Sequence, residues 1–290
     1  MTANVADEAT LRELSRLKVD DQFGDLRRRI KEGSVDPMRA SQGLQAVIEN
    51  RWDKREDLPY ANERVPSTLD YPQDFRYRTP AEQLEYWRAQ KATRKLDANY
   101  VPDLVKRIED AGLPAGMAGI GIWPKFSRLG GLYKAVNLIF CLISASRDFN
   151  NYRGGEITSR KHWRHTIQTA GCLQRLDEYQ PGDYMVVPVD FGKFWAGASI
   201  RHWQVRCMPM QFGLCPFTGG CLLLTHPNRI TGDGQLYLDL GGCEWSPLAD
   251  GDFYCSAHFD WCESRLDFGS RDVGNPYARC GVGVASVPQC

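Results

Sequence analysis

The sequence lacks an excess of charge of either sign, and it lacks any long apolar run. Its 290 residues include 36 Lys and Arg against 36 Asp and Glu, a formal net charge of +0. A balanced chain offers no general attraction for nucleic acid or anionic lipid, so neither is expected as a partner. No apolar stretch approaches the roughly 20 residues of a membrane span, and residues 1–7 lack the features of a signal peptide. We therefore expect no membrane span and a cytoplasmic location.

The sequence also lacks any CxxC pair, although it contains ten cysteines. The spacing of Cys207, Cys215 and Cys221 matches no zinc ribbon or finger. In a reducing compartment we expect free thiols, with no bound metal and no cofactor. Half of the cysteines lie near the end of the chain: Cys243, Cys255, Cys262, Cys280 and Cys290.

A dinucleotide-binding loop is absent as well. Gly119 and Gly121 alternate with apolar residues, but Pro124 stands where a GxGxxG loop requires its third glycine. The pattern favours a strand over residues 118–122.

Periodicity divides the chain into four regions. Residues 1–50 form a helical N-terminal region, because leucines from Leu11 repeat at helical spacing and Asp36-Pro37 can begin another helix. Residues 51–79 are polar and interrupted by proline, which predicts an extended linker. A capping box at Thr79 opens a helical pair over 80–112. The main domain then covers 113–290.

Within the main domain we expect both helices and strands. An apolar stripe predicts a helix from Leu132 to Ile143, and Thr158 is expected to cap another helix carrying Trp163 and Ala170. Residues 192–212 look irregular, and a helical turn is expected near 222–224. The expected strands are 184–189, 236–240, 252–261, 265–268 and 282–287.

Two groups of side chains could hold a metal ion. His162 and His165 are expected three apart on a helix, but the neighbouring Arg160, Lys161 and Arg164 disfavour a cation. Four carboxylates could bind calcium, although they lack EF-hand spacing. These are Asp239, Glu244, Asp250 and Asp252.

A thiol enzyme is the main alternative chemistry. His226 could lower the pKa of Cys215 or Cys221 and activate a nucleophile. Packing in the core is the competing interpretation of Cys221, since Leu222 follows it.

An aromatic group could instead form a stacking surface for sugars or bases. Trp195 and Trp203, with Phe194 and His202, are the candidates. Half-buried packing in the core is the competing interpretation of both tryptophans.

The final segment combines an apolar frame with exposed-looking polar residues. The frame consists of Phe259, Leu266, Phe268, Val273 and Val282. The residues between them include Arg, Tyr, Asp and Cys without a period, as in a binding surface whose loops and strand faces are used for contact. An ordinary loop-rich surface is the alternative that the residues leave open.

The C-terminal half resembles the variable proteins of diversity-generating retroelements. The matching phrases are "NYRGGEIT", "GDYMVVPVDFG", "GCLLLTHPNRI", "LYLDLGGCEWSP", "ADGDF" and "GVGVASVPQ". The resemblance implies an α+β fold with a C-type lectin-like domain, in which two helices pack on short antiparallel strands. It also implies a variable segment at about 243–290, rewritten by a reverse transcriptase that alters template adenines.

The genetic code supports this resemblance. Changing the adenines of an Asn codon ending in C or T reaches Tyr, Cys, His, Asp, Ser, Arg, Gly, Phe and Asn, but never Lys, Met, Glu, Gln or Trp. No Lys follows Lys193, and Trp261 and Glu263 fall outside the reachable set. The expected ligand-binding positions are Tyr254, Cys255, His258, Asp260, Cys262, Ser270, Arg271, Asp272, Asn275, Tyr277, Arg279 and Cys280.

Together these features predict a non-catalytic protein that binds a protein or another macromolecule. The N-terminal helices could join copies of the chain. Formylglycine-generating enzymes share the lectin-like fold but end in a Gly-Phe-Arg-Val type strand, whereas this chain has Gly281-Val282-Gly283-Val284. The missing arginine disfavours an oxidase, which together with a Cys/His hydrolase is the enzymatic alternative.

Overall fold

The chain separates into two compact units, Met1–Asp57 and Leu58–Cys290. The computed structural model describes residues 19–32, 60–208 and 210–288. The described part of the first unit is helix α2, Val19–Lys31, with three basic residues in its last turn, where they oppose the negative end of the helix dipole. The expected helices at Leu11 and after Pro37 lie outside the described residues.

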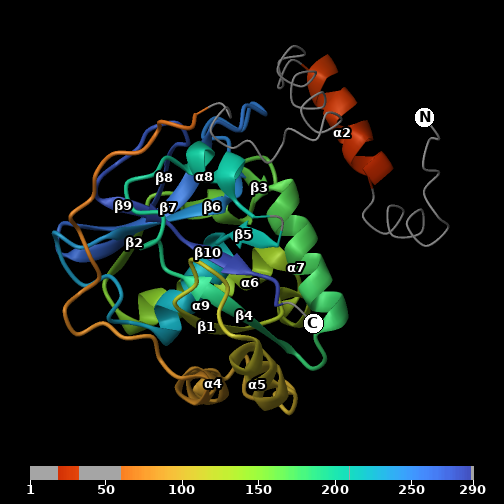
Figure 1. Cartoon of the computed structure of the whole chain (residues 1–290), viewed down its shortest axis with the longest axis vertical. Helices are drawn as coiled ribbons and strands as arrows, with labels where there is room; N and C mark the ends of the chain where they lie inside the picture. Colours follow the sequence, from red (N-terminus) through yellow and green to blue (C-terminus); the bar gives the residue numbers. More distant parts are fainter. Residues whose placement is uncertain (1–18, 33–59, 209, 289–290) are drawn as a thin grey trace, which may run out of the picture. The chain divides into compact units, whose positions relative to one another are not determined.

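The second unit contains helices and strands interleaved along the chain (Figure 1). Its α-helices are α4 Pro80–Ala89, α5 Val101–Ala111, α6 Leu132–Ser146, α7 Ile167–Tyr179, α8 Ile200–Arg206 and α9 Pro216–Thr225. Its strands are β1 Gly119–Pro124, β2 Phe149–Asn151, β3 Trp163–His165, β4 Tyr184–Asp190, β5 Gln211–Gly213, β6 Tyr237–Trp245, β7 Cys255–Cys262, β8 Arg265–Asp272, β9 Cys280–Val282 and β10 Val284–Ser286. This content confirms the predicted α+β class. Among the described residues, none of the helices has both the length and the apolar character needed to cross a bilayer.

The helical pair begins as the sequence predicts. The Thr79 side chain accepts a hydrogen bond from the Glu82 backbone, and the Glu82 carboxylate accepts one from the Thr79 backbone, which completes the capping box of α4. Trp87 in this helix is fully buried and donates its indole N–H to the Ile122 carbonyl oxygen at 2.9 Å. Helix α4 is therefore fixed to β1.

The strands form two sheets. The smaller sheet has the order β1-β4-β10-β5, and all of its pairs are antiparallel. The larger sheet has the order β2-β8-β7-β6-β3, and β9 lies parallel to part of β6. The C-terminal segment contributes to both sheets, because β9 joins the larger and β10 joins the smaller.

Helix α6 packs its apolar side against the larger sheet. Phe140 stands edge-on to Phe268 of β8, with ring centroids 4.7 Å apart, and also contacts Phe259 of β7 at 5.9 Å. Helix α9 lies close to α6 at Gly220, where a Cβ atom would come within 2.6 Å of Ile139. The close approach explains a glycine inside a helix.

Two sequence predictions for this unit were wrong. Thr158 ends a short 3-10 helix, Trp163 lies in β3, and α7 is instead capped by Thr166. Trp163 pairs with Trp245 of β6. Pairing with the distant strand β6 therefore places Trp163 in a strand, although the local sequence pattern favours a helix. The segment 192–212 is also more regular than expected, since it contains α8 and the start of β5.

Residues 60–79 belong to the second unit and run over the rest of it without forming a helix or a regular strand. The Val65 backbone N–H donates to Gly197, and the Leu236 N–H donates to the Asp70 carbonyl oxygen, both at 2.9 Å. Arg229 is fully buried beneath this segment, and its guanidinium lies 4.3 Å from the centre of the Tyr71 ring. These contacts hold the segment against the domain.

Candidate ligand-binding face

A tight hairpin of β7 and β8 carries most of the predicted binding residues. The two strands pair antiparallel from Cys255↔Asp272 to Cys262↔Arg265. The two residues of the turn, Glu263 and Ser264, have φ of 49° and 64°. Positive φ at both positions suits a two-residue hairpin turn, because its twist matches that of the strands. The hairpin thus holds its side chains in a fixed register.

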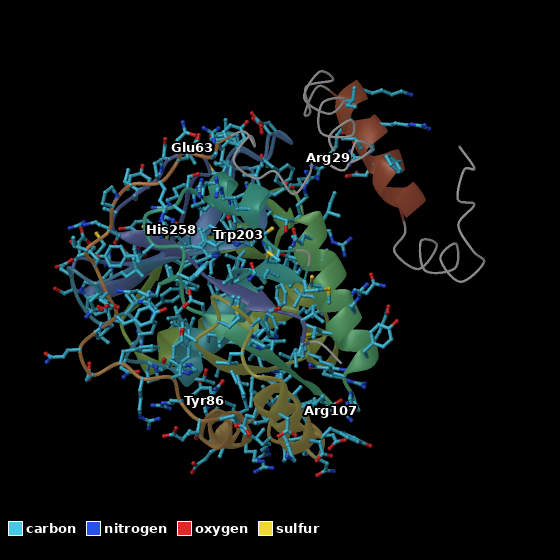
Figure 2. The ribbon with its side chains drawn as sticks, viewed as in Figure 1. Arg29, Glu63, Tyr86, Arg107, Trp203 and His258 are labelled. Atoms are coloured by element: carbon cyan, nitrogen blue, oxygen red, sulfur yellow. The ribbon has the colours of Figure 1, made fainter. Side chains whose placement is uncertain are left out.

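The two faces of this hairpin differ in character. Side chains alternate along a strand, so one face presents the buried Phe259 and Phe268 to α6. The opposite face presents His258 and Asp260 from β7 and Arg271 from β8. Figure 2 labels His258 among the strands of the larger sheet. The polar face therefore lies on the side of the sheet away from the aromatic core.

Ten of the twelve predicted binding residues reach the surface to some degree. Six are exposed: Tyr254, Cys262, Asp272, Asn275, Tyr277 and Arg279. Four are partly exposed: His258, Asp260, Ser270 and Arg271. Two are buried: Cys255 at 5% and Cys280 at 4% exposure.

Arg271 organises the polar face. Its guanidinium forms an ion pair with Asp239 of β6 and donates a hydrogen bond to the Cys280 sulfur at 2.8 Å. The same group lies 4.5 Å from the centre of the Tyr277 ring, within range of a cation–π contact. Because β7 separates β8 from β6, Arg271 reaches across the middle strand. Three of the predicted residues are thus brought together around one guanidinium.

His258 and Asp260 stand beside this group on β7. Their nearest side-chain atoms, Nε2 and Oδ2, are 3.5 Å apart. Gly269 is the cross-strand neighbour of His258, and a Cβ there would come within 3.0 Å of the imidazole. The glycine leaves room for the ring. His258 Nδ1 is buried and has no hydrogen-bond partner.

Burial controls the ionisation of the groups beneath the face. Burial raises the pKa of the Asp239 carboxyl, although the Arg271 charge opposes this effect. Burial also raises the pKa of the Cys280 thiol, and it raises the pKa of Cys255 to about 11. Neither thiol has the low pKa of a reactive nucleophile.

The residues of the thiol alternative are deep in the core. Cys215, Cys221 and His226 have 0% exposure. Burial raises the pKa of both thiols and lowers the pKa of His226 to about 4. His226 packs against aromatic rings, with Phe191 at 5.0 Å between centroids. These surroundings favour neutral groups over a thiolate–imidazolium pair.

The side chains of the metal alternatives do not gather. His162 and His165 are not on a helix, because His165 belongs to β3 and His162 precedes that strand. Asp239 is paired with Arg271, and Glu244 with Arg164 at 2.7 Å. Within the described ranges, no three His, Cys, Asp or Glu side chains form a group that could hold a metal ion.

The aromatic alternative places its two tryptophans in packed positions. Trp203, labelled in Figure 2, and Trp195 belong to a small core cluster with Val282 and Val284. Phe194 is exposed and stands edge-on to Trp195. A stacking surface built on both indole faces is therefore not present.

Sequence reasoning missed the central role of Asp239, which it had weighed only as a calcium ligand. The signal was present in the alternation of Leu238, Asp239 and Leu240. Both leucines are fully buried, so the carboxylate between them must leave β6 on the opposite face. The pattern does not reveal that Arg271 is the partner of this carboxylate.

A separate cavity of about 570 Å³ lies at the end of α6. Trp261, Arg147, Tyr86 and Arg78 are among its lining residues. Arg147 donates to the Ile230 carbonyl oxygen at 2.9 Å and is thereby committed to the fold. None of the twelve predicted residues lines this cavity, so it is distinct from the polar face.

No protein-family model, curated protein or solved structure matches the chain.

Proposed function

We propose that this chain is a non-catalytic, cytoplasmic ligand-binding protein with a C-type lectin-like domain. Its final segment displays a face whose side chains are changed by retroelement-directed mutagenesis of adenines. One observation carries the proposal: within residues 254–284 most of the predicted apolar frame is buried, whereas most of the predicted binding positions reach the surface. Phe259, Leu266, Phe268, Val282 and Val284 all have 0% exposure, whereas ten of the twelve predicted binding positions reach the surface.

The residues outside the adenine-reachable set support the same division. Glu263 occupies the hairpin turn with a positive φ, and Trp261 lines the cavity at the end of α6. Both serve the scaffold. The turn at Glu263 and the packed Trp261 indole help to set the register of the two strands. Both must therefore stay constant when the exposed side chains of the face change.

Several features of the fold support the lectin-like assignment. Two helices, α6 and α7, are followed along the chain by the strands that carry the face. The face is built on antiparallel strands, and the chain ends in β10, which pairs with β4 of the other sheet. The hairpin is paired on both sides within the larger sheet, by β6 and by β2, so it can change its exposed side chains without refolding.

The shape of the face favours a macromolecular ligand. The predicted residues spread over two strands and the segment that follows them, outside the cavity at α6. Tyr and Arg are enriched at the energetic centres of protein interfaces, and Tyr277 and Arg279 are both exposed here. A protein surface is therefore the expected partner. We assign the N-terminal unit a role in joining copies of the chain.

The locus of the gene tests the proposal. We expect a near-copy of the 3′ end close to the gene, differing from it mainly at adenines, beside a gene for a reverse transcriptase. The near-copy should carry Asn codons or other adenine-rich codons at the ten surface-reaching positions. A locus with neither the near-copy nor the reverse transcriptase would refute the retroelement proposal.

A further inference from the structure

Asp239 is a carboxylate held beneath the polar face at a position outside the proposed variable segment. It lies in β6, which pairs with β7 through Asp239↔His258, and it has 0% exposure. Burying a carboxylate is costly unless a cation or several hydrogen bonds compensate for its lost hydration. Asp239 therefore needs a positively charged partner in every version of the chain, although the residues of the face above it change.

In this chain Arg271 is the cation that pairs with Asp239. Its guanidinium pairs with Asp239 Oδ2 and stacks on the Tyr277 ring. The match is incomplete, because Asp239 Oδ1 and Arg271 Nε are both buried without a hydrogen-bond partner. The carboxylate therefore retains an acceptor that its present occupant leaves unused.

We propose that Asp239 is the fixed base of a guanidinium-binding recess, and that residue 271 decides whether the chain or its ligand fills it. With Arg271 the recess is closed by the chain itself. A small residue at 271, such as the adenine-reachable Ser or Gly, leaves the recess open to an arginine side chain of a protein partner. The natural opening of the recess rests on the proposed function, whereas the recess itself does not.

The proposal can be tested by removing the Arg271 guanidinium and asking whether free methylguanidinium binds in its place. The variant R271S removes the occupant, and the double variant D239N/R271S also removes the carboxylate charge. Thermal unfolding is followed with and without methylguanidinium chloride, against sodium chloride at equal ionic strength. Measurements are made at pH 8, because burial raises the pKa of Asp239 and a higher pH favours its charged form.

R271S should show a melting temperature that rises with the logarithm of the methylguanidinium concentration above its dissociation constant, by roughly 3 °C at about ten times that constant. Wild type and D239N/R271S should show no rise, because one recess is filled and the other has lost its charge. The proposal is overturned if R271S responds as the double variant does.

A second comparison covers the case in which R271S does not fold. The double variant should then be recovered folded, because it removes the uncompensated buried charge. Failure of both variants, or a double variant less stable than R271S, would show that the carboxylate is not the base of the recess. A locus without a retroelement would leave these results unchanged and would remove only the natural variation at residue 271.

Discussion

Truncation of the buried Phe268 should destabilise the protein far more than truncation of an exposed residue of the same hairpin. Phe268 has 0% exposure, and its ring lies edge-on to Phe140 at 4.7 Å and near Phe259 at 5.1 Å. Complete burial of such a side chain stabilises by about 1.5–3 kcal/mol, and the cavity left by truncation adds to the loss. We therefore expect F268A to lower the free energy of unfolding by about 3–5 kcal/mol.

The matched control is Y254A, which removes an aromatic ring of similar size from the exposed end of the same hairpin. Tyr254 is 43% exposed, so its truncation should change the free energy of unfolding by no more than about 0.5 kcal/mol. Urea unfolding followed by tryptophan fluorescence measures both variants. Equal losses in the two variants, or a larger loss for Y254A, would refute the division into frame and face.

Three further predictions concern the scaffold. R229M should lower the free energy of unfolding in urea by about 2–5 kcal/mol, because the Arg229 guanidinium donates to two buried backbone carbonyl oxygens that would lose their partner; a change below about 1 kcal/mol would contradict this. Burial lowers the pKa of His165 and His226 to about 4, so both stay neutral in the folded state above that pH. The unfolded chain binds protons at both imidazoles below about pH 6.5, so the free energy of unfolding should be constant above that pH and should fall as the pH drops toward 4. An NMR titration in which either imidazole of the folded protein protonates near pH 6.5 would disprove this. The exposed Cys262 should react with a maleimide in the folded protein and the buried Cys215 only after unfolding, as mass spectrometry of labelled peptides can show; fast labelling of Cys215 would contradict its burial.

The sequence predicts the elements that local chemistry specifies. The capping box at Thr79 locates the start of α4, and the alternation around Leu238 locates β6. Alternation also predicts β7 and β8, the two strands that carry the face. Each of these signals lies within a few residues of the element that it specifies.

The features that the sequence does not predict depend on distant partners. Thr158 and Thr166 are both residues of the type that caps a helix, and only the pairing of β3 with β6 decides which of them does so. Likewise, Asp239 and Arg271 lie on strands separated by a third, so their contact depends on strand order and register. The frame of the binding face is readable from one segment, whereas the ion pair beneath it is not.

The frequency of substitutions at each codon, measured by deep sequencing of sibling copies of the gene, tests the central claim most directly. The account predicts that changes concentrate at the exposed positions between Tyr254 and Arg279 and spare Leu266, Phe268 and Val282. Substitutions spread evenly over exposed and buried codons, or absent from the segment, would contradict a fixed frame beneath a changeable binding face.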